Sequence, residues 1–346
     1  MAVLSAMGTA ATPASTRDSL APTSRVEDAL ASPLKRIVIS TNSLPESLLF
    51  YRDAMGLSVA GPVKLSELEH KRRTRAWALD SRESWQLYRL YRSGVQAAAE
   101  IELLVFDHIK PAIHKSWNPL ALGPLSIGFP NADQISRDKA VRDLGFGALN
   151  TLEIYPVPRP DGTTYRIQET IYNGPDFVHA VGIHRADGQT QLGPLDAKGL
   201  GGPAYSAMVV QDSVKMIAFM TEVLGWEVRS DRTWKSAGSK GALNVPDGTE
   251  FRFSILYAKG ASSGHILLIQ FLNADVQPSA SPAQVPHRGI GMWVMQTQKM
   301  QAIRENAKKF GSNILRLNAE TLQESLVLTA PNGFKIWVEP TTVPDK

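Results

Sequence analysis

Apolar and polar positions repeat one pattern four times along this chain. A short apolar run predicts a strand, a polar turn follows, and an amphipathic stretch that ends at a glycine predicts a helix. The pattern is clearest at residues 50–59 and 219–228, each of which begins with phenylalanine. Two weaker copies place the helix-ending glycines roughly 80 to 90 residues apart, at Gly56, Gly145, Gly225 and Gly311. The chain therefore reads as four units of similar length.

Each of these glycines has a physical role in the pattern. A helix that packs its apolar side on a sheet has to stop and reverse, and glycine adopts the left-handed conformation of a helix C-terminus at little cost. Ser43 is a suitable N-cap for the first helix. Apolar residues after that helix predict further strands at residues 77–79, 85–91 and 99–106. We therefore predict an α+β fold of four βαβββ units.

Two domains are expected from the length of 346 residues. Glycines gather in residues 184–203, which predicts a linker between a two-unit domain at residues 34–183 and a second at residues 204–346. Residues 1–33 are rich in Ala, Ser, Thr and Pro and lack the basic start and apolar core of a secretory signal. We expect them to form a disordered arm, and we expect a cytoplasmic location.

Composition and charge exclude several classes of site and partner. Hydrophobic residues make up 43% and charged residues 20% of the chain, and no apolar run is long enough to span a membrane. The absence of cysteine excludes disulfides, thiolate metal sites and cysteine nucleophiles. The net charge is +4, and the basic run at residues 70–75 is interpreted as a solvated loop. The expected partner is a small molecule, with no nucleic acid and no membrane.

The repeated phrases at residues 37–59 and 207–228 and the closing turn at residues 331–336 resemble the vicinal oxygen chelate superfamily, which includes glyoxalase I, bleomycin-resistance proteins and type I extradiol dioxygenases. The resemblance covers the four units from residue 34 to residue 340. It implies that paired units curl into two open, mixed β-barrels with helices outside. It also implies a divalent metal on a concave face, held by a first-strand residue and by a Glu of a last strand. Exposed sheet edges would allow two copies to form a homodimer.

The resemblance places Arg36 and Tyr205 at the first-strand ligand positions of units one and three. Neither is an ordinary ligand of a divalent ion, because a guanidinium is always protonated and a phenol mostly is at neutral pH. Glu102 falls at the carboxylate position of unit one. A buried Arg36–Glu102 pair would replace the metal and leave a cation for an anionic or enolate oxygen, or it would be a structural salt bridge.

Tyr205 and His287 form the corresponding pair for the second domain, where phenol and imidazole could act as acid and base. The alternative is that Tyr205 is a cavity-wall residue and His287 a linker residue. Substrate contacts are expected at Gln270, Trp337, His179 and Trp293. We predict no cofactor and expect no metal; if a divalent metal is bound, its ligands are expected among Glu102, His179, His287 and Gln270.

Three functions remain open from the sequence. The first is a lyase, isomerase or hydrolase that acts on a small oxygenated molecule, for instance an aromatic one, by acid–base chemistry through an enolate-like state. The second is metal-dependent extradiol ring cleavage, which the four-unit length favours and the missing ligand triad opposes. The third is a protein that binds a small molecule without converting it, because aromatic walls would serve stacking equally well.

Overall fold

The structure is a computed structural model that describes residues 29–158, 162–238, 241–319 and 322–341. Residues 1–28 of the predicted disordered arm lie outside the described residues. Residues 29–33 were included in that arm, but they are ordered and contact the body of the protein. The backbone nitrogen of Ala31 donates to the carbonyl oxygen of Leu224 at 3.0 Å, and Ser32 donates to Gln296 at 2.8 Å.

Eight strands from the two ends of the chain form the first sheet. In chain order they are β1 (Arg36–Thr41), β2 (Ser58–Ala60), β3 (Trp85–Tyr91), β4 (Glu100–Phe106), β13 (Gly289–Thr297), β14 (Ile314–Ala319), β15 (Leu322–Thr329) and β16 (Lys335–Pro340). Across the sheet they lie in the order β14-β15-β16-β13-β1-β4-β3-β2. The first and last units therefore share one sheet, joined by the antiparallel pair β1 and β13.

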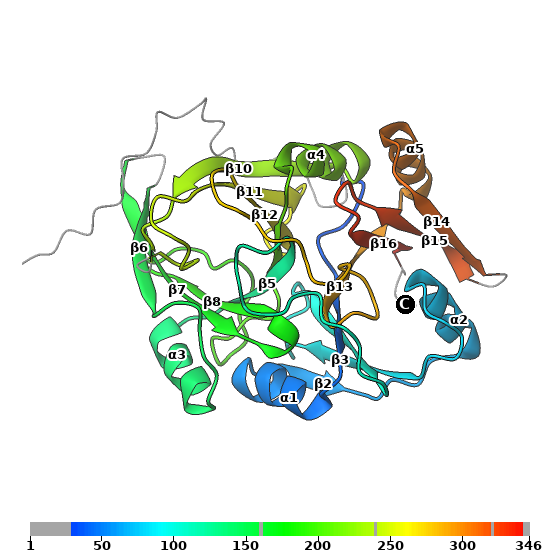
Figure 1. Cartoon of the computed structure of the whole chain (residues 1–346), viewed down its shortest axis with the longest axis horizontal. Helices are drawn as coiled ribbons and strands as arrows, with labels where there is room; N and C mark the ends of the chain where they lie inside the picture. The colour runs from blue at the N-terminus through cyan, green and yellow to red at the C-terminus, as the bar shows by residue number, and fades with distance from the viewer. Residues whose placement is uncertain (1–28, 159–161, 239–240, 320–321, 342–346) are drawn as a thin grey trace, which may run out of the picture.

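Eight strands from the middle of the chain form the second sheet. They are β5 (Gly123–Pro130), β6 (Glu153–Pro158), β7 (Thr164–Asn173), β8 (His179–Arg185), β9 (Tyr205–Val209), β10 (Trp226–Lys235), β11 (Glu250–Ala258) and β12 (His265–Phe271). Their order is β10-β11-β12-β9-β5-β8-β7-β6, and the antiparallel pair β5 and β9 joins units two and three. Figure 1 shows this sheet curled beside the first.

This pairing corrects the expected domain division. Consecutive units were expected to pair, as residues 34–183 and 204–346, whereas the sheets combine unit one with four and unit two with three. The physical reason lies in the connectors at residues 107–122 and 272–288, which run side by side through bridges at Ala112 with Arg288 and Ala121 with Gln277. They carry the chain from the first sheet to the second and back. The glycine-rich residues 184–203 therefore connect two units of one sheet.

Helices cover the sheets, so the predicted α+β class is confirmed. All four repeat glycines have positive φ angles, between 68° and 87°, which is the left-handed conformation expected at these helix ends. Ser43 caps the first helix by accepting from the Glu46 backbone nitrogen at 3.3 Å, as predicted. The helices are α1 (Leu44–Leu48), continued by the π-helical η2 (Leu49–Ala54), α2 (Glu67–Ala76), α3 (Gln134–Asp143), the short η3 (Pro175–Phe177), α4 (Ser213–Ala218), continued by η4 (Phe219–Val223), and α5 (Met300–Phe310).

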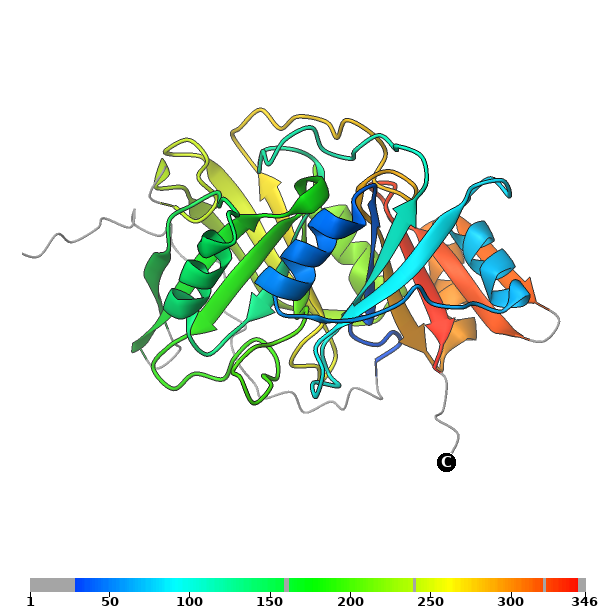
Figure 2. The same ribbon diagram turned by 90° about the horizontal axis from the view of Figure 1, so that it is seen from below.

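Helix α2 replaces two predicted features. The basic run at residues 70–75 was expected to be a solvated loop and residues 77–79 a strand, but the run is helical and Trp77 is its C-cap residue. Ser66 caps the helix, acidic residues occupy its first turn and arginines its last, which favours a helix through its macrodipole. The helix packs against β14, beside the orange strands in Figure 2.

One continuous apolar core joins the two sheets. Ile37 and Ile101 of the first sheet and Met208 and Leu268 of the second contribute to it, and Phe50 of η2 packs into it. Alternate residues of the same strands point to the opposite, concave face of each sheet, where polar side chains occur. None of the helices in the described part of the chain is long and apolar enough to cross a membrane.

Candidate functional site

The concave face of the first sheet carries a closed ring of ion pairs, which we call the arginine–glutamate ring. Arg36 Nε lies 3.0 Å from Glu102 Oε1, and Arg73 Nη1 lies 2.9 Å from Glu102 Oε2. Arg73 and Arg72 then meet Glu69 at 2.7 and 3.1 Å. Arg72 lies 3.6 Å from Glu339, and Glu339 closes the ring on Arg36.

The ring fastens α2 to the sheet. Three of its members, Glu69, Arg72 and Arg73, belong to α2, whereas Arg36 and Glu102 stand on β1 and β4. Every arginine contacts two carboxylates and every carboxylate contacts two arginines, so the three positive and three negative charges balance. The expected Arg36–Glu102 pair therefore exists, but neither charge is left over for a ligand while α2 stays in place.

Electrostatics holds the ring ionised. Burial alone would raise the pKa of Glu102, but the charges of Arg36 and Arg73 outweigh it and lower that pKa. Burial would likewise lower the pKa of Arg36, and Glu102 and Glu339 more than compensate, so that pKa is raised. Trp337 is fully buried under this ring, with the Arg72 guanidinium 5.1 Å from its ring centroid. Trp337 thus forms the floor of this face.

The concave face of the second sheet carries a different set of polar groups. They stand on alternate positions of neighbouring strands, in an apolar surrounding that includes Ile167, Val181 and Leu267. We call this set the tyrosine–histidine cluster, and its members are Tyr155, Glu169, Arg185, Tyr205, Arg229, Tyr257 and His265.

Three aromatic rings lie at the centre of the tyrosine–histidine cluster. Tyr205 and His265 pair in register on β9 and β12, with ring centroids 5.0 Å apart. Tyr257 stacks on the other side of His265 at 4.2 Å, with the Arg229 guanidinium 4.0 Å from the Tyr257 ring centroid. Gly128 makes room for this arrangement, because a Cβ atom there would lie 1.9 Å from a carbon of the Tyr205 ring.

Burial keeps these rings neutral. It lowers the pKa of His265 well below its usual value, and the charges of Arg185 and Arg229 lower it further. Burial and the nearby Glu169 raise the pKa of Tyr205 well above its usual value. The Nδ1 atom of His265 is buried without a hydrogen-bond partner among the described residues. A neutral imidazole with a free nitrogen therefore faces a protonated phenol.

Glu169 supplies the carboxyl group of the tyrosine–histidine cluster. The Tyr155 hydroxyl donates to Glu169 Oε2 at 2.6 Å, and burial raises the pKa of Glu169. The side chains of Tyr155, Glu169 and Arg185 are half-buried, so solvent reaches the cluster from their side of the sheet. A carboxyl with a raised pKa is suited to proton transfer near neutral pH.

Two expected residues turn away from Tyr205. His287 lies in the connector before β13, where its Nδ1 atom is 2.9 Å from the carbonyl oxygen of Pro282. Gln270 points to the helix-covered face, where its Oε1 atom accepts from the Ser213 backbone nitrogen at 3.0 Å and hydroxyl at 2.7 Å. The structure therefore does not bring Tyr205 and His287 together, and Gln270 holds the start of α4.

Two further expected contacts are buried elsewhere. His179 begins β8, with Nδ1 3.3 Å from the carbonyl oxygen of Tyr172, and burial lowers its pKa to about 4. Trp293 lies in the core between the sheets, where its Nε1 atom donates to the Ser206 hydroxyl at 3.1 Å. Neither belongs to the tyrosine–histidine cluster.

The donor groups do not fit the divalent metal that the resemblance implies. Glu102 and Glu339 are both occupied by arginines, whose positive charges oppose a bound cation. The four residues expected as ligands lie on different elements. Glu102 is on β4, His179 on β8, His287 in the connector before β13, and Gln270 on the helix-covered face of β12. Across the residues that the structure describes, no group of three His, Cys, Asp or Glu side chains is placed to share an ion.

Sequence reasoning missed most of the tyrosine–histidine cluster. Of its seven members only Tyr205 was singled out from the sequence. The sequence held one signal for His265: it is the first residue of β12, and Tyr205 is the first residue of β9, the parallel neighbour of β12. This signal can be used only if it is already known that the two strands pair in this register, with their first residues opposite each other.

The two curled sheets, with their strand order and covering helices, define the glyoxalase I type of fold, as the resemblance predicted. Among solved structures, glyoxalase I from Zea mays matches with a TM-score of 0.58 and 15% identity, over 88% of this chain and 91% of that one. A point mutant of it gives a TM-score of 0.59 and 13% identity over 90% and 93% of the two chains. A proposed dioxygenase from Bacillus subtilis gives 0.54 and 10% over 89% and 84%. No family model and no curated protein matches the sequence.

Proposed function

We propose that the protein is a glyoxalase-like enzyme of the lyase, isomerase or hydrolase type, and that it acts on a small oxygenated molecule at the concave face of the second sheet. The main support is the unpaired Nδ1 atom of buried His265 beside Tyr205. Leaving such a group unpaired costs on the order of 1–3 kcal/mol, which a bound ligand would recover. Perturbed titratable groups gathered on one face are typical of functional sites.

The proposed chemistry divides the roles among three residues. Tyr205, kept protonated by burial, donates a hydrogen bond to a carbonyl oxygen of the substrate. Glu169 takes a proton from the carbon next to that carbonyl, and the positive charge of Arg185 stabilises the enolate oxygen. Where the deprotonated carbon bears a hydroxyl, returning the proton to the former carbonyl carbon while the hydroxyl proton passes to the former carbonyl oxygen completes an isomerisation. Where the next carbon bears a leaving group, expelling that group from the enolate completes an elimination.

This proposal changes two roles expected from the sequence. His265 takes the place of His287 as the imidazole beside Tyr205, where its free nitrogen accepts a hydrogen bond from a substrate hydroxyl. Arg36 and Glu102 become anchors of α2, because the arginine–glutamate ring already satisfies both charges.

A binding protein without catalysis is the second candidate. The stack of Tyr257 on His265 at 4.2 Å, with the Arg229 guanidinium over Tyr257, forms an aromatic platform. Such a platform would hold a planar ligand by stacking alone.

We also propose that the protein is cytoplasmic and that it forms a homodimer. Light scattering of the purified chain tests the homodimer.

Proton exchange in heavy water tests the enzyme proposal without knowledge of the product. Small hydroxyketones and an aromatic 2-oxo acid are incubated with the protein in D2O, and loss of their C–H signals is followed by NMR. We expect exchange with at least one compound. Tyr205→Phe and Glu169→Gln should each slow it by roughly 100-fold.

Tyr88→Phe provides a matched control, because it removes a hydroxyl from the other sheet, where Tyr88 contacts Gln86. Its exchange rate should equal that of the unmodified protein. Exchange that persists in Glu169→Gln would refute the assignment of the base. Binding of a compound to the second sheet, seen by chemical shift changes without any exchange, would favour the binding protein.

A further inference from the structure

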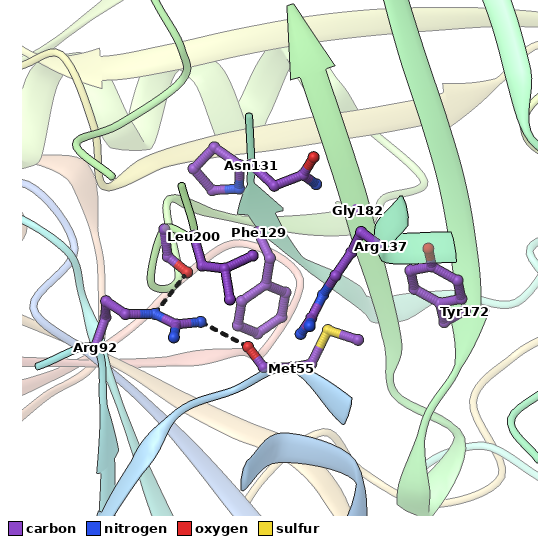
Figure 3. Close-up of a pocket in the computed structure, with 10 residues that line it drawn as sticks. Met55, Arg92, Phe129, Asn131, Arg137, Tyr172, Gly182 and Leu200 are labelled. Carbon is purple, nitrogen blue, oxygen red and sulfur yellow. Dashed lines mark hydrogen bonds between the residues drawn. The ribbon is translucent and has the colours of Figure 1, made fainter. Parts of the chain in front are cut away.

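A small cavity lies on the helix-covered side of the second sheet, away from the tyrosine–histidine cluster. Its volume is about 10 Å³, and Arg92, Phe129, Arg137 and Tyr172 are among its lining residues. Such a volume holds about one water-sized group. Figure 3 shows Arg92 and Arg137 entering this cavity from opposite sides. Two positive charges therefore face one small space.

Arg92 is held by the surrounding backbone. It follows β3, and its Nη2 atom donates to the carbonyl oxygen of Met55 at 2.6 Å, while Nη1 donates to Gly56. Its Nε atom donates to Gly201 at 3.3 Å, and Asp196 lies 3.5 Å from Nη1. These contacts fix the Arg92 guanidinium at the edge of the cavity and provide it with a counter-charge.

Arg137 has no such partners. Within the described ranges of the chain, its half-buried guanidinium makes no hydrogen bond and no ion pair. The nearby acids are engaged elsewhere, since Asp138 pairs with Arg142 at 2.9 Å and Asp196 with Arg92. Burial, together with the like charge of Arg92, lowers the pKa of Arg137 to about 10. The cavity thus contains one positive charge in excess.

We propose that this cavity receives one oxygen of a small oxyanion, with Arg137 as the counter-charge, and that the rest of the anion lies at the half-buried side of Arg137. The anion is either a free one such as inorganic phosphate or the carboxylate end of a small molecule. A guanidinium offers several N–H donors in one plane and suits both groups. Phe129 and Tyr172 also line the cavity, and their rings provide a low-dielectric surrounding for that oxygen, which strengthens the attraction.

Thermal unfolding of the full chain tests this site. Inorganic phosphate or sodium acetate is added up to tens of millimolar, with ionic strength held constant by the sodium salt of a bulky sulfonate buffer. We expect the Tm of the unmodified protein to rise by about 2–4 °C near saturation. A rise with phosphate alone identifies a free oxyanion site, and a rise with both salts identifies a site that also accepts carboxylates.

Two variants on α3 make the result specific. Arg137→Gln should abolish the rise and, without added oxyanion, should be at least as stable as the unmodified protein because it removes an unpaired charge. Lys139→Gln removes a positive charge from an exposed position of the same helix and should keep the rise. An equal rise in Arg137→Gln, no rise in the unmodified protein with either salt, or a lower Tm of Arg137→Gln without oxyanion would each overturn the proposal.

Discussion

Replacement of Glu102 by glutamine should destabilise the protein strongly at neutral pH. Glu102 is 1% exposed, and its two oxygens contact Arg36 at 3.0 Å and Arg73 at 2.9 Å. Removing one partner of a buried ion pair leaves an uncompensated charge and costs about 3–5 kcal/mol. Arg36 keeps Glu339 and Arg73 keeps Glu69, and the glutamine oxygen still accepts one hydrogen bond, so we expect about 3 kcal/mol, near the lower end of that range.

Glu100 offers a matched control on the same strand. Its carboxylate contacts Arg89 at 2.6 Å, but the two side chains are 27% and 49% exposed. Exposed pairs of this kind contribute about 0–1 kcal/mol. Glu100→Gln should therefore lower the free energy of unfolding by less than about 1 kcal/mol, although it makes the same chemical change.

The pH dependence gives an independent check on Glu102. Its pKa in the folded protein is below the usual value of 4.5, so its contribution to stability is full above that pH and is lost as the pH falls through the folded-state pKa. The stability difference between Glu102→Gln and the unmodified protein should therefore shrink as the pH falls below 4.5. For Glu100→Gln the difference should stay small throughout.

Urea unfolding followed by tryptophan fluorescence measures these differences. The indole ring centroids of Trp77 and Trp337 are 6.4 Å apart, and both side chains lie beside the arginine–glutamate ring. Their fluorescence therefore reports disruption of this ion-pair ring. Limited trypsin digestion adds a local measurement, because α2 carries Lys71, Arg72 and Arg73 and should be cut earlier in Glu102→Gln. A loss in Glu102→Gln no larger than in Glu100→Gln, with unchanged cleavage of α2, would refute the ring as the anchor of this helix.

Three further substitutions have defined outcomes. Gly128→Ala should cost about 1–3 kcal/mol in urea unfolding, because its Cβ would meet the Tyr205 ring; an unchanged midpoint would contradict that contact. Trp293→Phe should cost about 1–3 kcal/mol by leaving Ser206 without its donor, which differential scanning calorimetry would detect. Glu169→Gln should be more stable than the unmodified protein at neutral pH, since a raised carboxyl pKa means that stability is lost as pH rises, and the gain should vanish below the usual pKa of 4.5. Equal urea midpoints at neutral pH would contradict it.

The tyrosine–histidine cluster shows how far sequence reasoning reaches toward a site. Tyr205 was identified because the resemblance fixes its place in the first strand of unit three. His265 has no motif of its own, and its role depends on the pairing of β12 with β9. Glu169 comes from another unit, so its approach to Tyr205 depends on which units share a sheet.

The sequence by itself determined the repeating unit. Apolar periodicity predicted the strands and helices, and glycines with positive φ angles ended the helices at residues 56, 145, 225 and 311. These are local properties, because backbone conformation and the burial of one face depend on neighbouring residues. That locality is why they could be predicted without coordinates.

Only the tertiary structure decided how the units combine and which polar groups meet. Four similar first strands can pair with one another in more than one way, and the side-by-side connectors select unit one with four and unit two with three. That choice brings Glu339 of unit four to Arg36 of unit one, and it brings Glu169 of unit two near Tyr205 of unit three. Contacts between residues far apart in sequence depend on the packing of the whole chain, and a local sequence pattern does not specify that packing.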